Sequence, residues 1–176
     1  MVRNPINPLL KLIDIKNIKK EINNDDIKIV CDNTFASPYN QQPLTIGADV
    51  VLHSSTKYLG GHSDVIGGAI IIRDDKKLAE KIKYLQNAIG AVPSPFDCYM
   101  LIRSIKTLSV RMEKHNYNAM IISEYLNNHP KIKKVRYPGL KNDPNHNIAK
   151  SQMRGFGGII SIDLNTDLKG TLKFLE

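Results

Sequence analysis

The sequence has no long hydrophobic run. Its continuous apolar stretches have the length of a strand, as in residues 69–72, whereas a helix that crosses a membrane needs about 20 apolar residues. The first residues, MVRNPINPLLKLIDIKNIKK, also lack the apolar core of a secretory signal peptide. These absences predict a cytoplasmic protein without a membrane partner.

Cysteine is scarce in the sequence. The two cysteines, Cys31 and Cys98, do not have the spacing of metal ligands. Cys31 lies in an apolar pattern typical of a strand. This position indicates a buried free thiol in a reducing compartment.

Acidic residues are outnumbered, since 25 lysines and arginines stand against 17 aspartates and glutamates, for a net charge of +8. An excess of positive charge is found in many proteins that bind nucleic acid. Here the lysines are scattered over predicted helix faces, as in residues 76–83, and aromatic residues do not alternate with them. We therefore interpret the charge as solvated helix surface and expect no nucleic-acid partner.

The residues that are present predict an α/β fold. Apolar runs rich in β-branched residues alternate with amphipathic stretches, which is typical of strands joined by helices in a mostly parallel sheet. The predicted strands comprise residues 27–32, 48–53 and 67–73. The predicted helices comprise residues 9–22, 38–47, 74–90 and 97–128.

The organisation of the chain changes near residue 111, inside the long predicted helix. Beyond that helix, the pattern predicts short strands within residues 129–139 and 155–164, and the start of a final helix. We therefore predict two domains, residues 1–110 and residues 111–176, of which the second is the beginning of a smaller α/β domain.

Polar residues follow two of the predicted strands, in the sequences DNTF and SSTK. If these strands are neighbours, Asp32 and Lys57 lie in one crevice, because ligands of open α/β sheets bind beyond the carboxyl ends of the strands. A lysine amine can form a Schiff base with an aldehyde, hydroxyl groups can hold a phosphate, and a buried carboxylate can keep a pyridine nitrogen protonated. Together these groups suit pyridoxal 5′-phosphate (PLP). Taken singly, Lys57 could equally be a surface lysine and Asp32 a turn or helix-cap residue.

The segment VCDNTFASPYNQQPLTIGADVVLHSSTKYLGGHSDVIGGAI resembles the signature region of the PLP-dependent enzymes of cysteine and methionine metabolism. The resemblance continues from NPINPLLKLIDI through SPFDCYMLIRSIKTLSVRMEKH and YPGL to GFGGIISI. It implies a fold of the PLP-dependent transferase (aspartate aminotransferase) type. Residues 1–110 would then be the C-terminal part of the large PLP-binding domain, and residues 111–176 the incomplete small domain.

The resemblance also implies a role for each matching residue. Lys57 would form the Schiff base and act as the catalytic base, and Asp32 would pair with the pyridinium nitrogen. Ser54 and Thr56 would bind the phosphate, and Asn7 would hydrogen-bond the phenolic oxygen of the ring.

No metal is implied by the resemblance. His62 and Asp64 are two potential ligands on a glycine-rich loop, and a metal site needs three or four, so we interpret them as turn residues. Arg111, Glu113 and His115, in the sequence RMEKH, match a family pattern at helical spacing. We predict that these three residues have a structural role at the domain junction.

The chain departs from the family in two respects. Arg3 stands where the family usually has an acidic residue, which reverses a charge beside the predicted pocket. Family members are also longer, and their flanking portions supply further cofactor contacts and the arginine that binds the substrate carboxylate. We therefore expect a central fragment that has little or no turnover in isolation.

Within the family, GAVPSPFDCYM and RMEKH are most similar to cystathionine γ-lyase, which converts cystathionine to cysteine, 2-oxobutyrate and ammonia. Cystathionine γ-synthase, methionine γ-lyase and O-acetylhomoserine sulfhydrylase share the same core and are alternatives. An inactive truncated remnant is an alternative of another class. The resemblance implies a small sulfur amino acid as the substrate and a homotetramer as the assembly.

Overall fold

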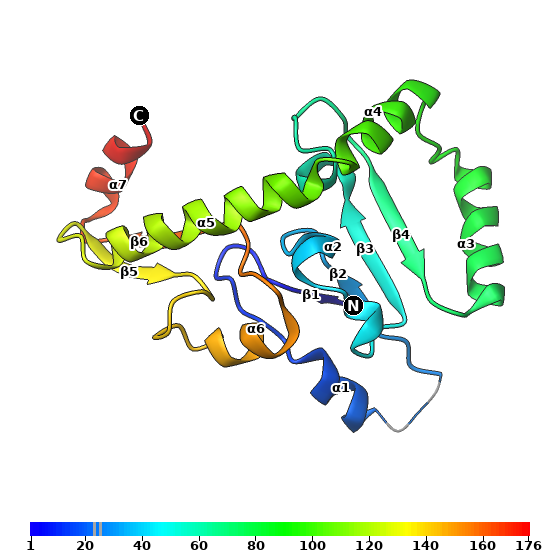
Figure 1. Ribbon diagram of the computed structural model, residues 1–176, viewed down its shortest axis with the longest axis horizontal. Coiled ribbons are helices and arrows are strands. Elements are labelled where there is room, and N and C mark those ends of the chain that lie inside the picture. Colours follow the sequence, from blue (N-terminus) through cyan, green and yellow to red (C-terminus); the bar gives the residue numbers. More distant parts are fainter. Residues whose placement is uncertain (23, 25) are drawn as a thin grey trace.

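A four-stranded sheet organises the first part of the molecule. The computed structural model describes residues 1–22, 24 and 26–176. Two of the three strand pairings are parallel, and the third is antiparallel. The strands lie side by side in sequence order (Figure 1): β1 (Val2–Arg3), β2 (Val30–Asp32), β3 (Val50–Ser54) and β4 (Gly68–Ile72). The prediction of an α/β fold with a mostly parallel sheet is confirmed.

Helix α1 (Ile15–Glu21) covers the core on one face of this sheet. Ile15 is fully buried and packs with Cys31 of β2 and Val51 of β3. Cys31 is the buried free thiol that the sequence predicted. Burial, together with the neighbouring charge of Asp32, raises the pKa of this thiol to about 12, so the thiol is inert near neutral pH.

Helix α1 begins later than the predicted helix 9–22. The carboxylate of Asp14 caps the helix by accepting a hydrogen bond from the backbone N–H of Asn17 at 2.9 Å. Before the cap, the side-chain amide of Asn4 binds both the N–H and the C=O of Ile13, each at 3.1 Å. These bonds hold the backbone out of a helix, and the prediction is therefore wrong over residues 9–14.

The helix predicted over residues 38–47 is replaced by two short pieces, α2 (Ser37–Asn40) and a 3-10 turn at Pro43–Thr45. Gln41 between them is extended, and its carbonyl accepts a hydrogen bond from the side chain of Asn33 at 2.8 Å. Proline has no N–H and clashes with the preceding helical turn, so Pro43 ends the first piece and starts the second.

The long helix predicted over residues 97–128 is also two helices, α4 (Pro95–Ile105) and α5 (Leu108–Asn127). At the break, the carbonyl of Ser104 accepts a hydrogen bond from the N–H of Thr107 at 3.2 Å, which tightens the last turn of α4. The break was not predicted because the sequence has helical periodicity on both sides of it.

Helix α5 extends from the first sheet to a second, two-stranded sheet (Figure 1). Strands β5 (Ile132–Arg136) and β6 (Ser161–Leu164) form this antiparallel sheet. At its start α5 buries Leu108 and Met112, and farther along it packs Ala119 into the core of the second sheet. The domain boundary after residue 110 stays a prediction, because α5 takes part in the packing of both regions.

Two further helices complete the second region. Helix α6 (His146–Gln152) was not predicted, and it packs Ala149 against Leu12 and Ala36 of the first region. Helix α7 (Leu168–Leu175) is the predicted final helix, and the carboxylate of Asp167 caps it.

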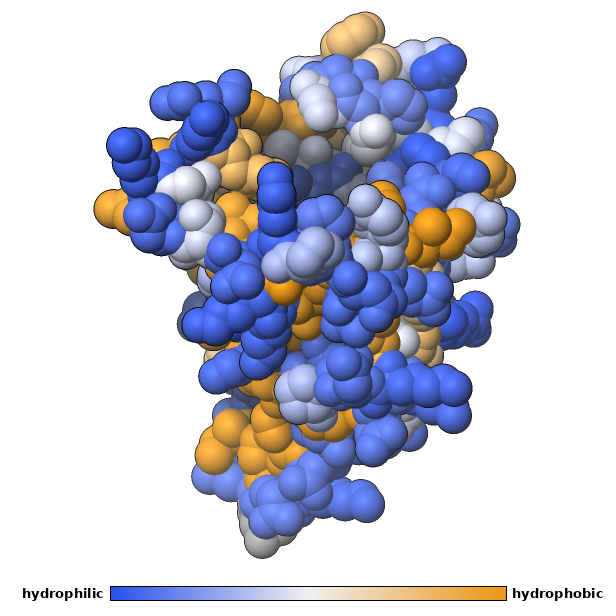
Figure 2. All heavy atoms as spheres, turned by 90° about the vertical axis from the view of Figure 1, so that its left-hand side faces the viewer, coloured by the Kyte–Doolittle hydropathy of each residue, from blue (hydrophilic) through white to orange (hydrophobic). Residues whose placement is uncertain are grey.

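Many large apolar side chains are exposed. Figure 2 looks onto the end of the molecule that β5, β6 and α7 form, and it shows apolar patches between hydrophilic residues. On the opposite end, helix α3 (Lys76–Ile89), which agrees with the predicted helix 74–90, and helix α4 expose Tyr84, Ile89, Phe96, Tyr99 and Ile102. Within the described residues, no helix is both long enough and apolar enough to cross a membrane.

Candidate functional site

Four of the five predicted site residues lie at or just after the carboxyl ends of two neighbouring parallel strands. Asp32 is the last residue of β2, and Ser54 is the last residue of β3. The strand register pairs Asp32 with Leu52, and residues that are paired or two apart share a face of the sheet, so Asp32 and Ser54 point to the same side. The expectation that these two strands are neighbours is therefore confirmed.

Lys57 lies in the turn Ser55–Leu59, directly after β3, and its own backbone there is not helical (φ −91°, ψ −122°). Hydrogen bonds to Gly67 hold this turn: the N–H of Ser55 donates to the Gly67 carbonyl at 2.9 Å, and the N–H of Gly67 donates to Oγ1 of Thr56 at 3.0 Å. The side chain of Lys57 is exposed and has no hydrogen bond or ion pair within the part of the chain that the structure describes.

Arg111 of α5 fixes the far side of this turn. Its guanidinium donates to the carbonyls of Tyr58 at 2.6 Å and Ser104 at 2.9 Å. Gly61 follows the turn with a φ of +71°, and a side chain there would collide with the Arg111 guanidinium. The glycine in the predicted loop is thus required both by its backbone conformation and by the close approach of Arg111.

The other two residues of the RMEKH pattern contact the same neighbourhood. Glu113 accepts a hydrogen bond from the Tyr39 hydroxyl at 2.9 Å. The ring of His115 packs edge-on against Tyr58, with the ring centres 5.2 Å apart. These contacts agree with the structural role predicted for Arg111, Glu113 and His115.

Asp32 is buried and tightly held. Its Oδ1 accepts hydrogen bonds from the Thr34 hydroxyl at 2.7 Å and the Thr34 N–H at 3.1 Å, and its Oδ2 accepts from Nε of Arg3 at 2.8 Å. Burial alone raises the pKa of Asp32, but the hydrogen bonds from Thr34 and Arg3 outweigh burial and hold the pKa below its usual value. The carboxylate is therefore ionised at neutral pH.

Thr34 was missed in the sequence, although it connects the two halves of the site. Besides binding Asp32, its hydroxyl oxygen accepts a hydrogen bond from the N–H of Ser54 at 2.8 Å. The hydrogen bond from the Thr34 N–H to Asp32 closes an Asx turn, which an aspartate favours, but the contact of the Thr34 hydroxyl with Ser54 has no local signal in the sequence.

His53 of β3 was missed as well. It is buried, and its Nδ1 has no hydrogen-bond partner within the described residues. Burial lowers the pKa of His53, and the nearby charge of Asp32 opposes this effect only in part, so the ring is neutral near pH 7. No pattern in the sequence distinguishes this residue from a core histidine.

Asn7, the fifth predicted site residue, does not lie at either of these strand ends. It lies exposed in the turn between β1 and α1, and within the described residues no hydrogen bond joins it to Asp32, Ser54, Thr56 or Lys57. His62, which we considered as a potential metal ligand, has its Nδ1 2.7 Å from the carbonyl oxygen of Gly60, as expected of a turn residue. Among the described residues, the structure contains no group of three potential metal ligands.

The donor set fits PLP. Among the residues that the structure describes, Oδ2 of Asp32 binds Arg3 alone, so it keeps an acceptor position for a pyridinium N–H. The Lys57 amine is available for an aldehyde. The Thr56 hydroxyl donates a long hydrogen bond of 3.4 Å to the Gly67 carbonyl, which it can exchange for a phosphate oxygen. These groups come from two adjacent strand ends, as a ligand beyond the edge of an open sheet requires.

Comparison with known proteins identifies relatives along the whole chain. A model of the Cys/Met metabolism PLP-dependent enzyme family matches residues 1–176. The chain is 54% identical to a cystathionine β-lyase of Coxiella burnetii, over 99% of the chain and 45% of the relative. It is 58% identical to a probable cystathionine γ-synthase of Herpetosiphon aurantiacus, over 90% of the chain and 49% of the relative.

A solved structure gives the same result. The cystathionine γ-lyase of Lactobacillus plantarum, crystallised with L-serine, superimposes with a TM-score of 0.87 and 49% identity, over 93% of the chain and 42% of the solved one. The chain thus spans about half the length of the curated relatives it matches. The chain belongs to the family of PLP-dependent enzymes of cysteine and methionine metabolism.

Proposed function

We propose that the protein is a PLP-dependent carbon–sulfur lyase of sulfur amino acid metabolism, with cystathionine γ-cleavage as its reaction. The observation that carries the proposal is the meeting of Asp32, at the end of β2, with the Ser54–Lys57 segment, at the end of β3. A carboxylate, hydroxyl groups and an available amine at one sheet edge are what the cofactor of this family needs.

Each side chain has a separate task in this proposal. Lys57 would hold the cofactor aldehyde, and its amine would serve as the base that takes the Cα proton of the substrate. Asp32 keeps the ring nitrogen protonated, while Ser54 and Thr56 bind the phosphate and Asn7 the phenolic oxygen. When bound, PLP supplies an electron-accepting ring.

The arrangement of the backbone supports these tasks. Arg111 and Gly67 hold the backbone of the turn on both sides of Lys57. The Cα of Lys57 therefore has a fixed position, while its exposed side chain is free to move the amine. The Thr34 hydroxyl joins Asp32 to Ser54, which keeps the ring-binding and phosphate-binding groups at a constant separation. Positioning of this kind contributes to catalysis by reducing the entropy lost in the reaction.

Covalent labelling tests the cofactor assignment without requiring turnover. The chain is incubated with PLP and reduced with borohydride, and its peptides are examined by mass spectrometry. We expect the pyridoxyl group on Lys57. Labelling spread over the exposed lysines, with no preference for Lys57, would contradict the assignment.

The choice of cystathionine γ-cleavage is supported by the GAVPSPFDCYM and RMEKH sequences. The relatives favour a second candidate, cystathionine γ-synthase, because one of them is a probable γ-synthase 58% identical to the chain. Product analysis distinguishes the activities. γ-Cleavage of cystathionine releases cysteine and 2-oxobutyrate, β-cleavage releases homocysteine and pyruvate, and a synthase forms cystathionine from an O-acylated homoserine and cysteine. A low rate of turnover does not affect this comparison, because each of the three activities gives different products.

The exposed apolar side chains of α3 and α4 support the proposal that the protein assembles as a homo-oligomer. A tetramer is the expected assembly. Light scattering at several protein concentrations measures the molar mass directly, and a monomer at all concentrations would contradict this part of the proposal.

A further inference from the structure

An ion pair links the first strand of the sheet to the proposed cofactor site. Arg3 and Asp32 are paired residues of the parallel strands β1 and β2, so their side chains point to the same face. Nε of Arg3 lies 2.8 Å from Oδ2 of Asp32. The aspartate side chain is 11% exposed and the arginine side chain 55%, so the guanidinium approaches the carboxylate from the solvent side.

The hydrogen bonds of Asp32 leave little capacity for a further donor. A carboxylate has about four acceptor positions, two on each oxygen. The hydroxyl and the N–H of Thr34 take both positions on Oδ1. Arg3 takes one position on Oδ2, and a single position remains there. A ring nitrogen that binds Asp32 must therefore share Oδ2 with Arg3.

We propose that Arg3 tunes the bound cofactor by sharing Oδ2 of Asp32 with the ring nitrogen of PLP, which lowers the affinity of that nitrogen for its proton. The inference rests on the proposed function, and it adds a residue and an effect that the proposed function does not contain. An arginine stays protonated at any working pH, so part of the carboxylate charge is always neutralised by it. A protonated ring nitrogen beside the guanidinium is a second cation on one anion, and the two cations repel each other.

The other titratable groups around Asp32 do not supply this effect. Cys31 on β2 and His53 on β3 both interact electrostatically with the aspartate. Burial keeps the thiol and the imidazole neutral near pH 7. In the proposed function, the amine of Lys57 is taken up by the cofactor aldehyde. Of these groups within the described part of the chain, Arg3 is therefore the one that acts as a permanent cation on Asp32.

The consequence for the reaction is that the cofactor ring withdraws electrons less strongly from the reacting carbon. A ring nitrogen that holds its proton firmly withdraws electrons from the reacting carbon, and a nitrogen that shares its carboxylate with arginine withdraws them less. Arg3 contacts Asp32 and acts through it, so it is a positioning residue.

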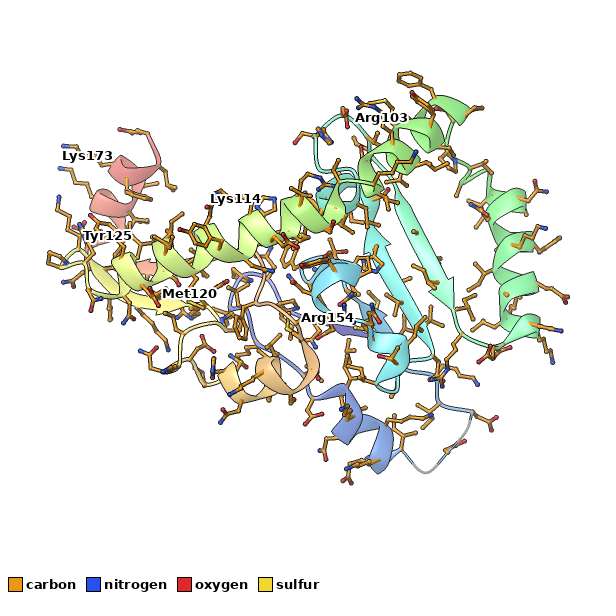
Figure 3. All side chains as sticks on the ribbon, viewed as in Figure 1. Arg103, Lys114, Met120, Tyr125, Arg154 and Lys173 are labelled. Atoms are coloured by element: carbon orange, nitrogen blue, oxygen red, sulfur yellow. The ribbon has the colours of Figure 1, made fainter. Side chains whose placement is uncertain are left out.

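Nitrogen NMR of the PLP-loaded 176-residue chain measures the effect directly. The cofactor is labelled with ¹⁵N in the ring, and its chemical shift is followed as a function of pH. We expect Arg3→Gln to raise the midpoint of the ring-nitrogen titration by about one pH unit, which is a tenfold gain in proton affinity. Arg3→Lys keeps the positive charge and should move the midpoint much less. Arg103→Gln on α4 removes the same charge from an exposed arginine outside this site and should leave the midpoint unchanged (Figure 3).

A second titration checks the ion pair without cofactor. Carbon NMR of ¹³C-labelled aspartate in the PLP-free chain should show a higher titration midpoint for Asp32 in Arg3→Gln than in the unchanged protein. Equal ring-nitrogen midpoints in the unchanged chain and Arg3→Gln would overturn the inference while leaving the proposed function in place. Failure of every form to bind PLP would overturn the proposed function, and the inference with it.

Discussion

The carboxyl ends of β2 and β3 hold their charged residues in opposite ways. At the end of β2 the side chain is fixed, because three hydrogen bonds from Thr34 and Arg3 surround the Asp32 carboxylate. At the end of β3 the backbone is fixed and the side chain is free: Arg111 and Gly67 hold the turn, while Lys57 extends into solvent. A group that must keep one charge state benefits from fixed partners. A group that must form and break a bond needs freedom to move.

Removing the side chain of Lys57 should have the largest effect on function and the smallest effect on stability. We expect Lys57→Ala to abolish covalent labelling by PLP and the visible absorption band that accompanies it. The free energy of unfolding should change by less than about 0.5 kcal/mol, because the lysine side chain is exposed. Urea denaturation and absorption spectra measure the two effects. A variant that still carries the band would refute the role of Lys57.

Removing Arg111, which supports the turn around Lys57, should reduce both stability and PLP binding. Arg111→Met deletes the donors to the carbonyls of Tyr58 and Ser104, and we expect a loss of about 2–3 kcal/mol of stability together with weaker PLP binding. Urea denaturation and a PLP titration provide the measurements. Arg103→Met is the matched control, since Arg103 is exposed and its side chain makes no hydrogen bond among the described residues. Equal stability losses in both variants would argue against a specific role for Arg111.

Removing a hydrogen bond from the fixed carboxylate of Asp32 should have a smaller effect on stability, and that effect should depend on pH. Thr34→Val keeps the shape of the side chain but removes the hydroxyl that joins Asp32 to Ser54, and we expect a loss of about 1–2 kcal/mol at pH 7. The folded-state pKa of Asp32 is lowered, so its contribution to stability is present above the unfolded pKa of about 3.9 and is lost as the pH falls through the folded value.

The difference between Thr34→Val and the unchanged chain should therefore narrow as the pH falls below about 4. Urea unfolding at a series of pH values between neutral and acidic provides the measurement. A difference that stays constant over this range would show that the hydroxyl acts through packing and not through the charge of Asp32.

Much of the site could be predicted from the sequence because strand patterns and loop chemistry are local. The apolar β-branched runs before Asp32 and Ser54 identified two buried strands, and parallel neighbours necessarily bring their carboxyl ends to one edge. The contact of Asp32 with Arg3, and that of Arg111 with the turn that carries Lys57, could not be predicted in this way. Arg3 and Arg111 lie 29 and 53 positions from the groups they bind in Asp32 and Tyr58, and no local pattern encodes such contacts.

Two of the elements that were predicted incorrectly also depend on contacts between distant residues. The helix expected from residue 9 starts at Ile15 because the distant side chain of Asn4 takes the backbone groups of Ile13. Helix α6 was missed because it is too short for a clear periodicity, and it is stabilised by packing against Leu12 and Ala36.

The sequence by itself determined the α/β class, the buried strands and the identity of the groups that suit PLP, because these follow from side-chain chemistry and periodicity. Only the tertiary structure decided that Asp32 is bound by Arg3, that Thr34 binds Ser54, and that the backbone around Lys57 is held by Arg111. Hydrogen bonds between distant residues depend on where the strands and α5 pack. That packing is a property of the whole folded chain.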